Sequence, residues 1–248
     1  MAKTASQALH PIAPDREARG CSFALEEHGD RLELRALHRR NYGAICADWN
    51  GDELRRRIAA GRRQPLARAA GLHKGQALHL LDANAGLGRD GYTLAAFGAA
   101  VSLVERNPAV AALLRNAHER AFADAQTRAV AQRIDIIEAE ARAVFASGCH
   151  WDVVYLDPMY PDDGKSALPA KEMQILRDLT GGDEDADQLL EPALACARQR
   201  VVVKRAPKAP WLAGMEPSMS LRSTQLRFDV YLKTAIRIAR PAHDFHIP

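Results

Sequence analysis

The sequence predicts an α/β fold in which helices cover both faces of a doubly wound, mostly parallel sheet. Short apolar runs of strand length recur from residue 77 onward, helix-like patterns separate them, and each run ends beside a charged residue. Such runs are typical of strands that are buried on both faces, and their alternation with helices is typical of a parallel sheet. We expect the segment 71–248 to form this sheet.

The expected strands and helices of this segment follow the apolar runs in order. Strands are predicted over residues 77–81, 99–104, 134–137, 151–156 and 201–203, with one or two more in the alternating tail 219–233. Helices are predicted after the glycine-rich loop behind the first strand, from Asn107-Pro108 onward, over 166–178 and over 187–197. Asn is a favoured N-cap and Pro suits the first helical position, so a helix start at 107–108 is well defined.

A small β-rich α+β domain is expected ahead of the sheet, over residues 21–70. Residues 1–20 are polar, contain two prolines and predict a flexible tail. Residues 23–37 predict a β-hairpin, because apolar positions alternate on both sides of a turn at 28–30. A short strand over 42–49 and a basic helix over 52–60 complete this domain.

The overall charge is nearly balanced, but its distribution along the chain is uneven. The 248 residues carry 34 Lys and Arg against 31 Asp and Glu, a formal charge of +3. Arginines crowd residues 55–68, where Arg62 and Arg63 lie, and a second basic group surrounds Lys204 and Arg205. Such groups suit a phosphate-rich partner, and they equally suit solvated helix surfaces.

The sequence lacks the patterns of a metal site, a membrane span or an export signal. The four cysteines lie far apart without a CxxC spacing, and the histidines show no ligand spacing, so we expect no metal. No apolar stretch is long enough to cross a membrane, and the N-terminus has no apolar signal segment. These observations favour a cytoplasmic protein with reduced thiols and no membrane partner.

Candidate binding residues directly follow the first two expected strands, where open α/β sheets bind their ligands. After the first strand, Gly86 and Gly88 allow the backbone to turn sharply and approach a ligand, and a helix N-terminus follows them. After the second strand, Glu105 lies 17 positions beyond Gly88 (105 − 88 = 17), where a carboxylate can accept hydrogen bonds from both hydroxyls of a ribose. A dinucleotide and S-adenosylmethionine both fit this pair of features.

Two features of the glycine loop favour S-adenosylmethionine over a dinucleotide. The loop lacks the third glycine of a dinucleotide-binding loop, and Asp90 beside it would repel a pyrophosphate while it suits the cationic methionine moiety. Glu140, after the third strand, can accept a hydrogen bond from the adenine amino group. A carboxylate at a helix start is also favoured by the helix dipole alone, so the interpretation of Glu140 stays open.

The tetrapeptide Asp157-Pro158-Met159-Tyr160, after the fourth strand, indicates the chemistry. It resembles the D/N-P-P-Y/F motif of amino-methyltransferases, with Met in place of the second Pro. An aromatic amine becomes a better nucleophile when both of its N–H groups donate to fixed acceptors. The Asp157 carboxylate and the Pro158 carbonyl can be these acceptors, because the proline ring fixes the backbone direction. Tyr160 can stack on a base that has left its helix.

Three alternatives stay open on these residues alone. An amino-methyltransferase of DNA adenine or of a protein glutamine would share the tetrapeptide. A nicotinamide-dependent oxidoreductase would share the sheet and the glycine loop. A ribosome-assembly factor that has lost catalysis is the third, although the presence of the tetrapeptide speaks against it. The order of glycine loop, ribose carboxylate and tetrapeptide favours a methyltransferase.

Four longer strings are similar to one family. The chain resembles the bacterial small-subunit ribosomal RNA guanine-N2 methyltransferases of the RsmJ type. The resemblance is carried by the strings LDANAGLGRDGYTLA, LVERNPAVAALL, VVYLDPMYPDDGKSALPAKEMQ and RVVVKRAP. The similarity runs from about Tyr42 to Tyr231. It implies a Rossmann-like class I methyltransferase sheet and transfer of a methyl group from S-adenosylmethionine to N2 of one guanine in 16S ribosomal RNA. The partner would be that RNA or the small ribosomal subunit.

The resemblance also implies site residues. By motif position, cofactor contacts fall on Arg89, Asp90, Glu105, Arg106 and Asp157. Family members often carry Ser-Ser where this chain has Glu140-Ala141, so the family's contact does not transfer directly, but Glu140 can still hold the adenine there. Contacts with the RNA backbone, which would make the affinity depend on salt, are expected from Arg62, Arg63, Lys165, Lys204 and Arg205.

Overall fold

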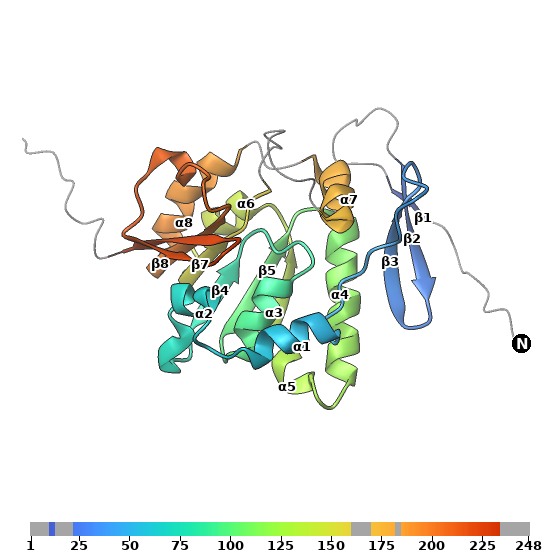
Figure 1. The fold of residues 1–248 in the computed structure, drawn as a ribbon, viewed down its shortest axis with the longest axis horizontal. Helices are drawn as coiled ribbons and strands as arrows, with labels where there is room; N and C mark the ends of the chain where they lie inside the picture. The colour runs from blue at the N-terminus through green and yellow to red at the C-terminus, as the bar shows by residue number, and fades with distance from the viewer. Residues whose placement is uncertain (1–9, 13–21, 160–169, 182–184, 234–248) are drawn as a thin grey trace, which may run out of the picture.

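The computed structural model contains a seven-stranded sheet and a separate three-stranded sheet (Figure 1). It describes residues 10–12, 22–159, 170–181 and 185–233. The strands of the large sheet are ordered β6-β5-β4-β7-β8-β10-β9. Their bounds are β4 His79–Asp82, β5 Ala100–Glu105, β6 Ile134–Glu138, β7 Trp151–Leu156, β8 Ala197–Arg205, β9 Met219–Arg222 and β10 Arg227–Leu232.

The large sheet is mostly parallel, which confirms the predicted fold class. The pairs β4–β5, β5–β6, β4–β7 and β7–β8 are parallel, whereas β10 is antiparallel to both β8 and β9. All of the predicted strands of this segment are present. Because parallel strands run the same way, the carboxyl ends of β4, β5, β7 and β8 lie at one edge of the sheet.

Helices cover both faces of this sheet (Figure 1). Leu80 and Val153 belong to one hydrophobic cluster, whereas the following residues, Leu81 and Val154, belong to a second one. This alternation buries both faces of each strand and explains why the strands read as continuous apolar runs. The helices are α1 Asp52–Ala59, α2 Pro65–Ala70, α3 Arg89–Ala96, α4 Pro108–Ala123, α5 Arg128–Ala131, α6 Ala141–Ala146, α7 Lys171–Thr180 and α8 Leu190–Cys196, with short 3-10 turns η1 Leu72–Lys74, η2 Ala186–Leu189 and η3 Leu212–Gly214.

Helix α4 begins where the sequence predicted. The side chain of Asn107 accepts hydrogen bonds from the backbone N–H groups of Ala109 (3.0 Å) and Val110 (3.2 Å), and Pro108 occupies the first turn. This N-cap satisfies two N–H groups that have no partner within the helix. It also fixes the chain directly behind Glu105, at the edge where the parallel strands end.

The N-terminal region differs from the prediction in two places. The hairpin is confirmed as β2 Phe23–His28 and β3 Arg31–Ala36, but a third strand, β1 His10–Ile12, pairs with β2 inside the segment expected to be a tail. The predicted strand over 42–49 is wrong. Only an isolated bridge joins Ile45 to Leu34, because the chain then crosses to the glycine loop, where the Trp49 indole donates to the carbonyl of Leu87 (3.0 Å).

The N-terminal sheet packs against α4 and shares its hydrophobic core. Asn116 of α4 accepts from the backbone N–H of Leu32 (3.0 Å) and donates to the carbonyl of Asp30 (2.9 Å). Phe23, Leu34 and Trp49 belong to the same buried cluster as the apolar faces of α3 and α4. The boundary predicted near residue 70 therefore does not coincide with a break in the core, and the division into two domains stays a prediction.

Close packing of α3 onto the sheet sets the geometry of the site. A Cβ atom added to Gly91 would lie 2.3 Å from Leu103 Cδ2 and 3.1 Å from Asp82 Oδ2. Since neither neighbour is exposed, only glycine permits this approach. The first turn of α3, with Asp90, is thereby placed beside the carboxyl end of β4.

Among the described residues, no helix is long and apolar enough to cross a membrane.

Candidate active site

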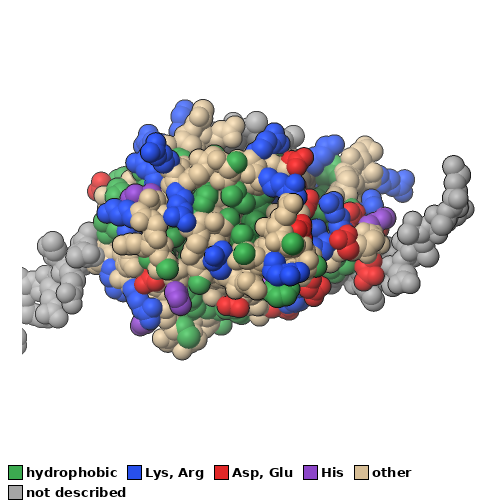
Figure 2. Space-filling model, turned by 90° about the horizontal axis from the view of Figure 1, so that it is seen from below, with side chains coloured by type: hydrophobic (Ala, Val, Ile, Leu, Met, Phe, Trp, Pro, Cys, Tyr) green, Lys and Arg blue, Asp and Glu red, His purple; other side chains and the backbone are tan. Residues whose placement is uncertain are grey.

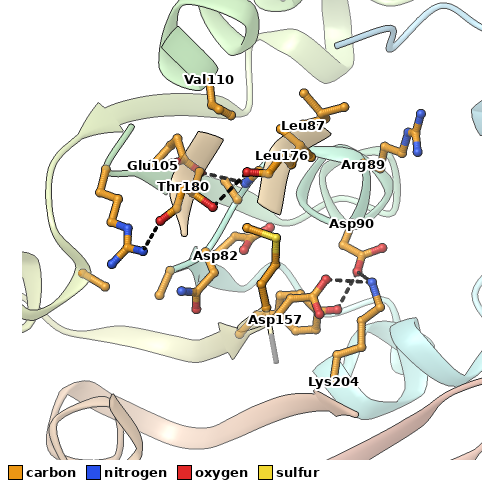
Figure 3. Close-up of a pocket in the computed structure, with 18 of the residues that line it drawn as sticks. Asp82, Leu87, Arg89, Asp90, Glu105, Val110, Asp157, Leu176, Thr180 and Lys204 are labelled. Atoms are coloured by element: carbon orange, nitrogen blue, oxygen red, sulfur yellow. Dashed lines mark hydrogen bonds and ion pairs between the residues drawn. The ribbon is translucent and has the colours of Figure 1, made fainter. Parts of the chain in front are cut away.

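A cavity of about 280 Å³ opens at the edge where β4, β5, β7 and β8 end (Figure 3). Its floor carries charged residues from these strand ends: Asp82, Glu105, Asp157 and Lys204. Helix α7 supplies a second wall with Met173, Leu176 and Thr180, and α1 supplies Glu53 and Arg57. The edge predicted from the sequence thus holds a concave site lined by both polar and apolar groups.

Glu105, the last residue of β5, is buried and held through both of its oxygens. Oε2 accepts from the backbone N–H of Gly86 (3.0 Å), and Oε1 accepts from that of Asn107 (2.8 Å). A carboxylate has about four acceptor positions, so it can hold backbone N–H groups and ligand hydroxyls together. The orientation of this carboxylate is therefore fixed before a ligand enters the cavity.

The two glycines of the loop have different roles. Both have positive φ angles, +53° at Gly86 and +71° at Gly88. A Cβ added to Gly86 would meet nothing within 4 Å, and this residue lines the cavity. A Cβ added to Gly88 would lie 2.8 Å from Trp49 and from Leu114. Gly86 therefore faces ligand space, whereas Gly88 permits packing of the loop against the core.

Asp82 and Asn84 line the cavity with buried oxygen atoms that no described residue satisfies. Oδ1 of each side chain lies out of contact with solvent and without a hydrogen-bond partner in the described part of the chain. Burial raises the pKa of Asp82 well above its usual range, and the neighbouring Asp90 and Asp157 raise it further. Two acceptors of this kind indicate a ligand that brings its own donors.

Lys204 joins two carboxylates at the centre of the site (Figure 3). Its Nζ donates to Asp157 Oδ2 (2.7 Å) and to Asp90 Oδ2 (3.0 Å). Asp90 also accepts from the Tyr155 hydroxyl (2.5 Å) and forms an ion pair with Arg57. The five residues of this network come from β7, the loop after β7, β8 and the helices α1 and α3.

The network gives its carboxylates different proton affinities. Burial raises the pKa of Asp90, but Lys204 and Arg57 outweigh it, so that the pKa lies below its usual range. Burial also raises the pKa of Asp157, and there Lys204 opposes the shift only in part, while Asp90 adds to it. Burial lowers the pKa of Lys204, but the two carboxylates raise it more, so the ammonium stays charged. Asp90 is thus a fixed anion, and Asp157 is the carboxylate that is easier to protonate.

Asp90 does not have the free charge that the sequence interpretation gave it. That interpretation placed the cationic methionine moiety of a cofactor beside Asp90, yet Lys204 and Arg57 already neutralise its charge. Asp82, at the end of β4, lines the same cavity and has an oxygen without a partner among the described residues.

Arg89 and Arg106 both line the cavity and both hold helix α7 beside it. Arg89 Nη2 donates to Glu172 Oε2 (2.8 Å) in the first turn of α7, and Figure 3 shows its side chain directed away from Asp82 and Asp157. Arg106 Nη2 donates to the carbonyl of Thr180 (3.4 Å) at the other end of that helix. A cofactor contact by either arginine stays a prediction.

The remaining predicted site residues have diverse positions. Glu140 lies at the exposed start of α6, on the rim of the cavity. Pro158 is buried directly after Asp157. Tyr160 and Lys165, predicted to stack on the base and to contact RNA, lie outside the described residues.

The predicted RNA ligands divide into exposed and buried side chains. Arg62 and Arg63 are exposed before α2. Arg205 is 3% exposed and donates to the carbonyl of Pro210, and Lys204 is bound within the cavity, so neither is presented to a phosphate backbone. Their assignment to RNA is corrected for this reason. Figure 2, viewed from the side of α5, shows basic side chains spread over that face with apolar ones between them.

Three site residues were missed in the sequence. Asp82 closes the first strand and carries the unsatisfied oxygen, a position that the rule of strand carboxyl ends already indicated. Tyr155 lies inside an apolar run and Arg57 inside an arginine cluster. No local signal distinguishes these two from core and surface residues, because only the tertiary fold brings them to Asp90.

Comparisons with known proteins agree with this geometry. The model of the family described as "Putative SAM-dependent methyltransferase" matches residues 13–233. A ribosomal RNA small subunit methyltransferase J from Vibrio vulnificus is 47% identical over 226 residues, which cover 86% of this chain and 87% of that protein. The protein of the same name from Colwellia psychrerythraea is 47% identical over 216 residues, covering 86% of this chain and 79% of the relative.

A solved structure also resembles the chain. A crystal structure of a SAM-dependent methyltransferase from Neisseria gonorrhoeae superposes with a TM-score of 0.65 at 31% identity, covering 88% of this chain and 84% of the other. The large sheet with its helices therefore has the Rossmann-like class I methyltransferase fold.

Proposed function

Because this chain belongs to the ribosomal RNA small subunit methyltransferase J family, it is an S-adenosylmethionine-dependent ribosomal RNA methyltransferase, and we propose that it methylates the exocyclic N2 amino group of a guanine in 16S ribosomal RNA. The observation that supports the amino group as the target is the position of Asp157-Pro158 beside the cavity. A substrate of this kind also favours the expected location in the cytoplasm.

The residues of the cavity fit S-adenosylmethionine. Glu105 has a fixed carboxylate that suits the two ribose hydroxyls, and Gly86 leaves open space beside it. Asp82 and Asn84 offer buried oxygens to which the cationic amino group of the methionine moiety can donate. That amino group would also favour the ionised form of Asp82, whose pKa is otherwise raised by burial and by Asp90 and Asp157. Glu140, on the rim, is the proposed acceptor of the adenine amino group.

The protein's part in the reaction is to orient and activate the target amine. When bound, the cofactor supplies a methyl group on a positively charged sulfur, which needs no further activation. Asp157 and Pro158 would hold the amine nitrogen where it can bond to this methyl carbon, and the electron pair of the broken C–S bond would stay on sulfur. Asp157 Oδ1 and the Pro158 carbonyl accept hydrogen bonds from the two N–H groups of the amine. These two bonds orient the nitrogen so that its lone pair points toward the methyl carbon. After transfer the nitrogen loses one proton, which Asp157 can accept and pass to water.

The RNA would lie over the mouth of the cavity and reach toward exposed basic side chains. Arg62 and Arg63 are the predicted ligands that are exposed in the structure. Tyr160 remains the proposed stacking partner of the flipped guanine.

Nucleoside analysis of the methylated product tests the proposed function. Purified protein and labelled S-adenosylmethionine are incubated separately with small ribosomal subunits, free 16S ribosomal RNA, DNA and a protein mixture, all taken from cells that lack the enzyme. We expect label in the ribosomal RNA, recovered as N2-methylguanosine after digestion. Label recovered as N6-methyladenosine, or confined to DNA or protein glutamine, would contradict the proposal.

Binding of the cofactor product is a second, independent check. Calorimetric titration is expected to show binding of S-adenosylhomocysteine and no response to NAD. Because Glu105 is the proposed acceptor for the ribose hydroxyls, the variant Glu105→Ala should weaken S-adenosylhomocysteine binding by about 10- to 100-fold, equivalent to the loss of about one hydrogen bond to a charged group. Binding of NAD alone would contradict the assignment of the cavity.

A further inference from the structure

A single ammonium group lies between the proposed amine acceptor and a second carboxylate of the cavity. We propose that Lys204 is a positioning residue of the methyl transfer, which fixes one oxygen of Asp157 and keeps this carboxylate ionised. The inference rests on the proposed role of Asp157 as an acceptor of the target amine.

The contacts of Lys204 leave one oxygen of Asp157 for the substrate. Nζ donates to Asp157 Oδ2 at 2.7 Å, and no described residue donates to Oδ1. Asp157 lies at the cavity with its side chain 34% exposed, whereas the side chain of Lys204 is 22% exposed. A carboxylate tied at one oxygen cannot rotate freely, so Oδ1 keeps one direction toward the incoming amine.

Lys204 is itself held from the other side. Asp90 Oδ2 accepts from Nζ at 3.0 Å, and the same oxygen accepts from the Tyr155 hydroxyl at 2.5 Å. Arg57 binds the other oxygen, Oδ1. Asp90 is therefore fixed from α1, β7 and β8, and it gives the ammonium a position that does not depend on Asp157.

The charge balance of the site depends on the same ammonium. The groups near Asp157 are Lys204, Asp90, Arg57, Asp82 and Tyr155. Burial raises the pKa of Asp157 and Asp90 adds to it, while Lys204 is the foremost group that lowers it. Without Lys204, Asp157 would be protonated at higher pH, and a protonated carboxyl donates a hydrogen bond where the amine needs an acceptor.

The pH dependence of single-turnover methyl transfer tests this inference. The enzyme with small ribosomal subunits or 16S ribosomal RNA is compared with Lys204→Met, which keeps the apolar stem, and Lys204→Arg, which keeps the charge. Lys208→Met, an exposed lysine on the following loop, is the matched control for loss of one positive charge. We expect Lys204→Met to lower the rate by about 10- to 100-fold near neutral pH, the range for loss of one positioned group.

The sign of the pH shift distinguishes positioning from a general loss of structure. The rate of the wild type should fall as pH drops through the pKa of Asp157. In Lys204→Met this fall should occur at higher pH, whereas Lys204→Arg should bring it back toward the wild type, and Lys208→Met should not move it. Some binding of S-adenosylhomocysteine should persist in Lys204→Met, because the hydrogen bonds of Lys204 go to Asp90 and Asp157, although its charge also lowers the pKa of Asp82.

Two results would overturn the inference. One is a Lys204→Met variant whose rate falls at the same acidic pH as that of the wild type, whatever the size of the rate. The other is a fall in rate that moves to higher pH in Lys204→Met and stays at that higher pH in Lys204→Arg. The variant Asp157→Ala separates the inference from its premise. Normal methyl transfer by Asp157→Ala would remove the proposed role of Asp157, whereas an inactive Asp157→Ala together with a Lys204→Met variant whose rate falls at the wild-type pH would refute only the role of Lys204.

Discussion

Asp157 and Asp178 are both carboxylates that bind basic side chains from distant parts of the chain, yet their surroundings differ. Asp178 of α7 accepts from Arg39 Nη2 through Oδ1 (3.0 Å), and His38 Nε2 lies 2.9 Å from Oδ2. Asp157 is bound by Lys204, but this cation is shared with Asp90. Asp178 thus has two basic partners, Arg39 and His38, whereas Asp157 shares its one basic partner, Lys204, with Asp90.

The pKa values follow from this difference. Burial raises the pKa of Asp178, but the hydrogen bonds from Arg39 and His38 outweigh it, and the pKa falls below its usual range. Burial raises the pKa of Asp157, and the shared Lys204 does not cancel this shift. The comparison indicates that the contact of Asp178 stabilises the fold by attaching the N-terminal segment to α7. Asp157 is held in a less favourable charge environment, which suits a group that must bind a substrate.

Removal of the Asp157 side chain should produce the largest change in activity. We expect Asp157→Ala to lower the single-turnover rate by about 10²- to 10³-fold, because the target amine loses one acceptor. Asp157→Asn should retain more activity than the alanine variant, since amino-methyltransferases carry either residue at this position of the motif. The free energy of unfolding should change by less than about 1 kcal/mol in both variants, because no apolar core is lost. A strongly destabilised Asp157→Ala would show that this contact is structural, as that of Asp178 is.

Gly91 tests how closely α3 must approach the sheet to place Asp90 beside Lys204. Gly91→Ala should destabilise the protein by about 1–3 kcal/mol, because the new methyl group would overlap Leu103. Urea denaturation followed by circular dichroism measures this change. Gly43→Ala is the matched control, since a Cβ there meets nothing within 4 Å and the backbone φ is not positive. Equal stability of the two variants would contradict the packing argument.

Asp178→Asn should affect stability more than chemistry. We expect the free energy of unfolding to fall by about 1–2 kcal/mol, as for partly exposed hydrogen bonds to a charged group. Because the folded-state pKa of Asp178 is lowered, its contribution is present above the ordinary carboxyl pKa and is lost as pH falls through the lowered value. The difference between the wild type and Asp178→Asn should therefore shrink in acid. Asp135→Asn, the same substitution at an exposed position of β6, is the matched control.

The smallest effect is expected from exposed charges that belong to neither network. Arg62→Ala and Arg63→Ala should each raise the KM for ribosomal RNA a few-fold. Each should also reduce the slope of log affinity against log salt concentration by about the amount expected for one phosphate contact. The affinity for S-adenosylhomocysteine should stay the same. Arg133→Ala, another exposed arginine, provides the comparison. If all three variants behave alike, the arginines before α2 are ordinary surface residues.

The sheet could be predicted from the sequence because its strands are buried on both faces and read as apolar runs. The position of the cavity followed as well, since Asp82, Glu105 and Asp157 each end or directly follow a strand. The charge partners could not be predicted. Arg205 and Lys204 are neighbours in the sequence and look alike as surface cations. Alternation along β8 turns Lys204 into the cavity, whereas Arg205 lies buried near Arg227.

The prediction of a strand over residues 42–49 was wrong for a related reason. Residues 42–49 alternate like a strand, but their apolar side chains belong to a core made by other elements. Trp49 is buried and packs against Tyr92 of α3 and His118 of α4. Alternation in the sequence reports which side chains are buried and does not report whether a neighbouring strand is present to pair with.

The contact between Trp49 and the glycine loop bears on how the protein could have changed in evolution. The indole fills the space that Gly88 leaves free, and its N–H holds the carbonyl of Leu87 at 3.0 Å. A segment that comes before the large sheet in the chain therefore supports the glycine loop that lines the cavity. Loss or exchange of residues 21–70 would disturb that loop, so this region is expected to be inherited together with the sheet and not as an interchangeable module.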